Sequence, residues 1–112
     1  WRELLTLDFI TLQRPSAVRL MLEEELARSG RQLDVALESH QLVTVGRMVA
    51  SGLGGSAVPA LCQSQMQALG AVCLPLDNPP IEKCVGVIHA GHLQLSKAAQ
   101  ALLGTLKGAF TA

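Results

Sequence analysis

The sequence predicts an α/β domain in which a mainly parallel sheet is flanked by helices. Short β-type runs alternate with helical segments along the chain, and parallel strands need such crossover connections. Hydrophobic residues make up 49% of the 112 residues, which is ample for a packed core. Because only 3% are aromatic, we expect Leu, Val and Ala to fill that core. The length fits one domain, or one lobe of a larger one.

Charge and hydropathy exclude several classes of function. The formal net charge is zero, so this segment has no basic surface for binding nucleic acid. No apolar run approaches the roughly 18 residues that span a bilayer, and no signal peptide is visible. The chain begins at Trp1 without Met, so we expect it to be a piece of a longer protein. Cys62, Cys73 and Cys84 form no CxxC pair, and we expect them to be buried and reduced.

The first elements are a strand at Phe9–Leu12 and a helix at Ala17–Arg28. Ser16 is a good N-cap for that helix, and Gly30 marks its end. The helix has an apolar stripe and a charged face that we expect to be solvated. Its spacing allows weak i,i+4 ion pairs of Arg19 with Glu23 and of Glu24 with Arg28. The stripe consists of Val18, Leu22 and Leu26, with Met21 beside them.

Further strands and helices follow in alternation. A strand at residues 35–38 precedes a helix at residues 41–51, which Ser39 caps and Gly52 ends. We expect short strands at residues 56–58 and 71–76, with a helix at residues 60–69 between them. A turn at residues 77–80 leads to a longer strand at residues 83–90. A last helix, capped by Ser96, runs to Ala112 with an apolar stripe of Ala99, Leu102, Leu103, Leu106 and Phe110.

Two helix starts are the best candidate binding site. The backbone N–H groups that open a helix favour an anion, and Arg14 and Ser16 lie at the first of these starts. His40 precedes the second start, where its imidazole could meet a ligand carboxylate. The carboxyl ends of parallel strands share one edge of a sheet, so both starts should line a common hollow. We assign no catalytic residue, no metal site and no cofactor; His89 and His92 are expected to be surface histidines.

One alternative is a fragment of a Rossmann-type dinucleotide-binding oxidoreductase. Gly52, Gly54 and Ala57 fit the pattern GxGxxA in residues 52–57. Against it, Pro59 would fall inside the helix that such a turn opens, at a cost of about 3 kcal/mol outside the first turn. The preceding residues also follow a helical rather than a strand period. A helix at residues 41–51 would favour a ligand-sensing domain, and a strand there followed by a helix from Gly54 would favour the enzyme.

Taken in order, several segments resemble the C-terminal part of LysR-type transcriptional regulators. Each segment alone is degenerate, but their order and spacing cover nearly the whole chain. The segments are WRELL at residues 1–5, FITL at 9–12, RPSAVR at 14–19, VGRMVASGLG at 45–54 with Pro59, LPLD at 74–77, VGVI at 85–88 and LSKAAQAL at 95–102.

This resemblance implies one lobe of a fold like that of type 2 periplasmic binding proteins. In that fold, two α/β subdomains flank a cleft that holds a small effector. Residues 1–95 would form effector-binding subdomain II, and residues 96–112 a helix returning towards subdomain I. DNA would be bound only through an N-terminal winged helix-turn-helix domain outside this sequence. The implied parent is a cytoplasmic homo-oligomer that senses a small anionic metabolite, without enzymatic activity or membrane contact. A solute-binding lobe without a link to DNA would share the fold.

The resemblance also implies which residues contact the effector. They fall at the same two helix starts, and Ala17 stands where peroxide-sensing members carry a reactive cysteine, so that redox mechanism is not expected here. The loop that opens the first helix would contribute Gln13, Arg14, Pro15, Ser16 and Ala17, and the segment before the second helix would contribute Ser39, His40, Gln41 and Val43.

Overall fold

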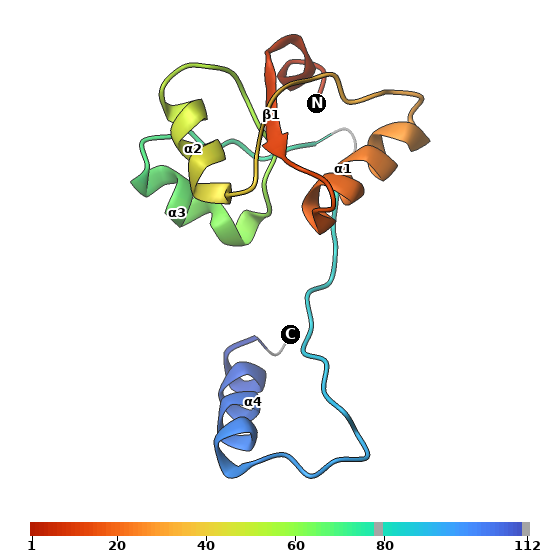
Figure 1. Cartoon of the computed structure of the whole chain (residues 1–112), viewed down its shortest axis with the longest axis vertical. Helices are drawn as coiled ribbons and strands as arrows, with labels where there is room; N and C mark the ends of the chain where they lie inside the picture. Colours follow the sequence, from red (N-terminus) through yellow and green to blue (C-terminus); the bar gives the residue numbers. More distant parts are fainter. Residues whose placement is uncertain (78–79, 111–112) are drawn as a thin grey trace. The chain divides into compact units, whose positions relative to one another are not determined.

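The computed structural model describes residues 1–77 and 80–110, and divides the chain into two compact units (Figure 1). The first unit is Trp1–Ile81 and the second is Glu82–Ala112. In the first unit, strand β1 (Phe9–Leu12) pairs in parallel with strand β2 (Val35–Ser39). Helix α1 (Ala17–Arg28) is the crossover between them. This βαβ arrangement confirms the predicted α/β class with a parallel sheet and flanking helices.

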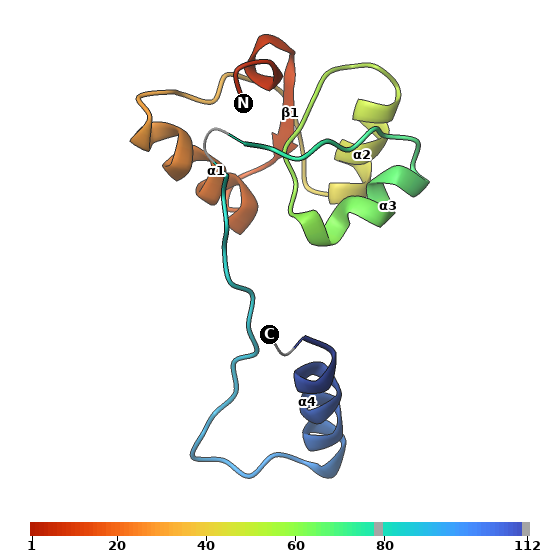
Figure 2. The same ribbon diagram turned by 180° about the vertical axis from the view of Figure 1, so that it is seen from behind.

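Strand β1 is the centre of the first unit. It lies between α1 on one side and helices α2 (Leu42–Ala50) and α3 (Gln63–Ala68) on the other (Figures 1 and 2). Phe9, Ile10 and Thr11 expose 2% or less of their surface. The core cluster joins Phe9 to Leu22 and Leu26 of α1, as the apolar stripe predicts, and adds Trp1 and Ala57. Leu22, Leu26 and Ala57 are the aliphatic members of this cluster, and Trp1 and Phe9 are its aromatic members.

Helix α1 begins and ends as its sequence predicts. The Ser16 hydroxyl accepts a hydrogen bond from the Arg19 backbone N–H at 3.5 Å. At the other end, Gly30 has a φ of 72°, which glycine adopts without steric cost. Gly30 N–H donates to the Ala27 carbonyl at 3.0 Å, and Arg31 N–H donates to the Leu26 carbonyl at 2.8 Å. These two bonds form a Schellman motif, which fixes the direction of the chain after the helix.

Helix α2 decides against the dinucleotide-binding alternative. It covers most of the predicted range 41–51, buries Val45 and is followed by Gly52 with a φ of 82°. No helix starts at Gly54; a Cβ there would collide with the backbone carbonyl of Asp8. Gly55 N–H donates to that same carbonyl at 2.9 Å. The glycines therefore allow two backbone segments to approach closely, and no phosphate-binding turn precedes a helix here.

The cap of α2 differs from the prediction. Gln41 is the N-cap residue and makes no side-chain capping bond. The Ser39 hydroxyl instead accepts from the Gln41 backbone N–H at 3.2 Å, which stabilises the turn before the helix. Beyond α2, the predicted helix at residues 60–69 forms in two parts, a 3-10 turn η2 (Ala60–Cys62) and then α3, and Gly70 follows with a φ of 95°. A further 3-10 turn, η1 (Leu4–Thr6), precedes β1.

Three predicted strands do not form. Residues 56–58 form no strand; just before them, Gly55 forms a single parallel bridge with Phe9. Residues 71–76 and 83–90 are mostly apolar, as buried strands often are, but neither has a pairing partner among the described residues. Without a ladder, a strand leaves its backbone groups unpaired, so these segments are irregular. Their side chains are correspondingly exposed, with Val72 at 85% and Ile88 at 98%.

The second unit contains helix α4 (Lys97–Phe110). The Ser96 hydroxyl accepts from the Ala99 backbone N–H at 3.1 Å, which confirms the predicted cap. The predicted end at Ala112 and part of the predicted turn at residues 77–80 lie outside the described residues. The division at residues 95 and 96 concerns subdomains of a parent protein and stays a prediction. Four residues of the helix stripe line a pocket of about 200 Å³ together with Val87, Ile88, His89 and Leu95; they are Ala99, Leu102, Leu103 and Leu106.

The cysteines are more accessible than expected. All three are free, but Cys62 and Cys73 are only half-buried and Cys84 is exposed. Cys73 and Cys84 lie in the segments that do not form strands, so no sheet covers them. Among the described residues, no group of three potential metal ligands comes together. Within the same residues, every helix is too short or too polar to cross a membrane.

Candidate functional site

The parallel pair β1–β2 brings the two predicted site segments together. Leu12 is the register partner of Ser39, so the two strands end side by side. Beyond that pair, Gln13 N–H donates to the Ser39 carbonyl at 2.9 Å, which joins the first predicted segment directly to the second. Only four residues separate the end of β1 from the start of α1, and two separate the end of β2 from the start of α2. Both helix starts therefore lie at the carboxyl edge of the sheet, where α/β proteins commonly bind ligands.

Most of the predicted site residues are accessible to solvent. The half-buried ones, Gln13, Ser16 and Ser39, are those whose backbone or hydroxyl groups hold the turns together. A cis peptide bond joins Arg14 to Pro15. The exposed members of the predicted set are Arg14, Pro15, Ala17, His40, Gln41 and Val43.

The two helix starts differ in whether a side chain caps their first backbone N–H groups. The Ser16 hydroxyl occupies one N–H group of the first turn of α1. At α2, no side chain caps the helix, so the first N–H groups keep their hydrogen-bonding capacity for solvent or a ligand. His40 is exposed immediately before that turn. The start of α2 is therefore the more receptive end for an anion.

Arg14 is paired within the protein. Its Nη2 and Nε atoms both donate to Oε1 of Glu23, at 2.8 Å and 3.2 Å. These bonds, and next the bond from Arg19, lower the pKa of Glu23 below its ordinary value. The Arg14 side chain is nevertheless 65% exposed, so it lies at the surface end of the pair. An anionic ligand would have to compete with Glu23 for Arg14.

The burial of Arg19 and its contacts beyond its own helix were not predicted from the sequence. The predicted pair with Glu23 is present at 2.8 Å, but Arg19 is only 7% exposed and also reaches Glu38 at the end of β2, at 2.6 Å. Its Nη1 atom additionally donates to the Leu12 carbonyl at 3.4 Å. Hydrogen bonding to Glu38 is the main cause that raises the pKa of Arg19. The signal that could have revealed this is Glu38 itself, a carboxylate at the end of a strand parallel to the one preceding α1.

The charged face of α1 is less solvated than its sequence suggests. Glu23 and Glu25 keep only 24% and 14% of their side-chain surface exposed. Arg28 pairs with Glu25 at 2.8 Å, in i,i+3 spacing, and the predicted pair of Arg28 with Glu24 is not present. The i,i+3 and i,i+4 positions are both neighbours on a helix, so spacing alone did not decide between the two glutamates.

Comparison with known proteins settles the family. The family description "LysR substrate binding domain" matches residues 1–111. The chain belongs to this family. The resemblance and the fold class predicted from the sequence are thereby confirmed: LysR substrate-binding domains have a periplasmic-binding-protein-like fold, with which the parallel sheet and flanking helices agree.

Curated relatives of this LysR-type domain are named as transcriptional regulators. The chain is 32% identical over 111 residues to the uncharacterized HTH-type transcriptional regulator YbhD of Escherichia coli K12, covering 99% of this chain and 35% of that protein. It is 29% identical over 103 residues to the probable RuBisCO transcriptional regulators of Trichormus variabilis and of Nostoc, covering 88% of this chain and 31% of each. The chain thus spans about one third of these relatives. No solved structure matches it significantly.

Proposed function

We propose that this chain is the effector-sensing part of a bacterial DNA-binding regulator, and that it binds a small anionic metabolite. The observation that carries the proposal is the hydrogen bond from Gln13 N–H to the Ser39 carbonyl, at 2.9 Å. It joins two accessible segments that each open a helix, which is an arrangement suited to holding an anion. The proposed contact residues are Gln13, Arg14, Pro15, Ser16, Ala17, Ser39, His40, Gln41 and Val43.

The ligand carboxylate would use donors that the protein leaves accessible. The uncapped N–H groups at the start of α2 and the exposed His40 are such donors. Arg14 would join by turning from Glu23 to the ligand, which its exposed side chain permits. The negative charges of Glu23 and Glu38 would still be paired, because Arg19 is bound to both carboxylates. Binding therefore separates no buried charge from its partner.

Sensing would be a shift of conformation and no bond would be made or broken. In the proposal, residues 1–95 form one wall of an inter-lobe cleft, and residues 96–112 return to a second lobe of the parent protein. The ligand would favour one arrangement of the lobes only by its differential affinity for the two states. The parent would be a cytoplasmic homo-oligomer that contacts DNA through its N-terminal helix-turn-helix domain. The regulator names of the curated relatives support this assignment.

A site-resolved titration tests the proposal. Acetate and benzoate, as minimal carboxylates, are added to the ¹⁵N-labelled chain while backbone amide shifts are recorded. We expect the amides of residues 13–14, 16–17 and 39–43 to shift together with one weak affinity, because half of the cleft is absent. Arg14→Gln should weaken binding, by up to about 10-fold if one charged hydrogen bond is lost.

The control variant is Arg28→Gln, which removes an exposed arginine at the C-terminal end of α1 that pairs only with Glu25 among the ion pairs described. This variant should leave the affinities for acetate and for benzoate unchanged. Shifts confined to one segment, or no saturable shifts at all, would contradict a shared site. Micromolar affinity for this chain alone would contradict the two-lobe cleft.

A further inference from the structure

Two arginines and two glutamates beside the proposed effector site form one connected cluster. Three donors meet at a single atom of it: Nε and Nη2 of Arg14 and Nε of Arg19 all donate to Oε1 of Glu23, at 3.2, 2.8 and 2.8 Å. Arg19 also donates to Glu38 at the end of β2, at 2.6 Å. Oε1 of Glu23 therefore joins the loop that opens α1 to the guanidinium group that bonds to both strand ends.

The two arginines of this cluster differ in how firmly the protein holds them. The Arg19 side chain is only 9% exposed and bonds to Glu23, to Glu38 and to the Leu12 carbonyl. The Arg14 side chain is 65% exposed, and the bonds described for it go to Glu23. Glu23 is thus fixed by the buried arginine, whereas Arg14 can turn away from Glu23 and leave that carboxylate paired.

The bond between Arg14 and Glu23 occupies a donor of the proposed effector site. Arg14 belongs to the segment that Gln13 joins to Ser39. While its Nε and Nη2 atoms donate to Glu23, they are not available to a ligand carboxylate, which is the same chemical group. Because Glu23 is part of the same chain, it competes at an effective concentration of the order of millimolar or above. A ligand must displace Glu23 to reach these two donors.

We propose that Glu23 is an internal competitor for Arg14, which lowers the affinity of the site for carboxylates; this inference rests on the function proposed above. A ligand carboxylate can displace Glu23 because it offers two free oxygens, one for each N–H of the guanidinium group. Glu23 presents only Oε1, which it shares with Arg19. Binding then replaces one carboxylate by another at Arg14, and Glu23 stays bonded to Arg19.

A double-mutant cycle of Arg14 and Glu23 tests the proposal. Acetate is titrated into the ¹⁵N-labelled chain at constant ionic strength, and the amides of residues 39–43, which include neither substituted position, report its affinity. We expect Glu23→Gln to bind acetate about 2- to 5-fold more tightly than the wild type, the range for loss of one surface ion pair. In an Arg14→Gln background, Glu23→Gln should leave the affinity unchanged, because no arginine remains to be released.

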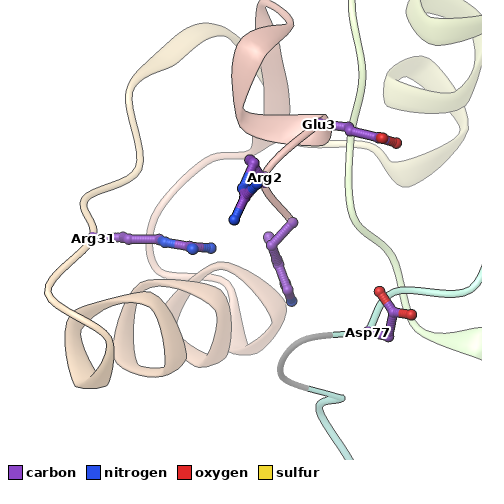
Figure 3. Close-up of a pocket in the computed structure, with 5 residues that line it drawn as sticks. Arg2, Glu3, Arg31 and Asp77 are labelled. Atoms are coloured by element: carbon purple, nitrogen blue, oxygen red, sulfur yellow. The ribbon is translucent and has the colours of Figure 1, made fainter.

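Two controls separate this contact from general electrostatics. Glu24→Gln removes the neighbouring exposed glutamate, which takes part in none of the ion pairs found among the described residues, and it should leave acetate affinity unchanged. The amides of Arg2 and Arg31 report any attraction of acetate to arginines in general. These two arginines line a pocket that contains no residue of the cluster or of the proposed site (Figure 3). We expect no saturable shift at either amide. Glu23→Ala replaces Glu23→Gln if that variant folds poorly.

The outcomes distinguish this proposal from the proposed effector site. The internal competitor alone is overturned if acetate shifts residues 39–43 of the wild type and Glu23→Gln binds it no more tightly. It is also overturned if Glu24→Gln gains as much affinity, or if the gain persists without Arg14. If neither the wild type nor the Glu23 variants show saturable shifts at residues 39–43, the effector site and the competitor both fail. Shifts of equal affinity at Arg2 and Arg31 would likewise overturn both.

Discussion

Arg19 connects three parts of the first unit through one guanidinium group. It bonds to Glu23 on its own helix, to Glu38 at the end of β2 and to the Leu12 carbonyl at the end of β1. These contacts fix the start of α1 over the two strand ends. Arg19 therefore positions the segments proposed to bind the effector, although it is itself only 7% exposed.

Replacing Arg19 should destabilise the fold. In Arg19→Gln, Glu38 and Glu23 lose charge-assisted hydrogen bonds, and we expect the free energy of unfolding to fall by about 1–3 kcal/mol. The lower part of this range applies because Glu38 is 41% exposed and can be hydrated. Urea unfolding measures the change. Arg28→Gln, in a pair whose arginine is 67% exposed, should stay within about 0.5 kcal/mol of the wild type. Equal losses in both variants would refute this role.

Glu23 gives the fold a pH dependence of known sign. Its pKa is lowered from 4.5 by the bonds from Arg14 and Arg19, so the folded state binds its proton less readily than the unfolded state does. This stabilisation is present above the unfolded-state pKa and is lost as the pH falls through the folded-state pKa. Glu23→Gln should therefore flatten the fall in stability below about pH 4.5. Urea melts between pH 7 and pH 3 test this, and Glu24→Gln should keep the wild-type slope.

At the scale of elements, the contact of residue 54 with Asp8 holds the loop after α2 against the start of β1. Any Cβ at Gly54 collides with a backbone carbonyl, which cannot rotate away as a side chain could. We expect Gly54→Ala to lower the free energy of unfolding by about 1–3 kcal/mol, the usual cost of overpacking. Chemical denaturation of the first unit measures it.

The control for Gly54→Ala is a helical glycine with free space around it. Nothing lies within 4 Å of a Cβ built at Gly104 in α4. Gly104→Ala should therefore raise the helicity of α4, since alanine is favoured by up to about 1 kcal/mol over glycine in a helix. Circular dichroism follows this change. A loss of helicity in Gly104→Ala, or an unchanged stability in Gly54→Ala, would contradict the contacts described.

Helices were predictable from the sequence because their signals are local. Ser16, Gly30 and Ser96 mark helix ends through contacts with residues three or four positions away. Strands were less predictable, because a strand at residues 71–76 or 83–90 needs a distant partner that no local pattern reveals. The candidate site shows the same division. Sequence placed both helix starts at one edge, whereas the pairing of Arg14 with Glu23 and of Arg19 with Glu38 depends on tertiary geometry.

At the scale of the whole chain, the exposed apolar side chains of the second unit predict self-association. Ile88, Leu102 and Phe110 expose 98%, 61% and 74% of their surface. Isolated apolar residues are common on protein surfaces, but several in one small unit favour contact with another surface. We expect the chain to form dimers or larger species as its concentration rises, as measured by sedimentation velocity.

Substitutions on α4 test which surface is responsible. The double variant Leu102→Asn and Phe110→Asn should shift the chain towards the monomer. Leu61→Asn serves as the control, because Leu61 is 71% exposed in the first unit and lies away from α4 in sequence. A strictly monomeric wild-type chain at all concentrations would refute the prediction.

The burial of β1 has a consequence for how the chain opens. Ile10 N–H donates to the Gly55 carbonyl at 2.8 Å, and β2 pairs with the other side of β1. The Ile10 side chain is fully inaccessible to solvent. Its amide proton can meet solvent deuterium only when the sheet and the covering helices separate, so its protection factor should report the global stability of the first unit. Amides at residues 82–95, which have neither helix nor ladder, should lose their protons at nearly the rate of a free peptide. A single mass-spectrometric time course would then distinguish slow hydrogen exchange around the four-residue strand β1 from fast exchange at residues 82–95.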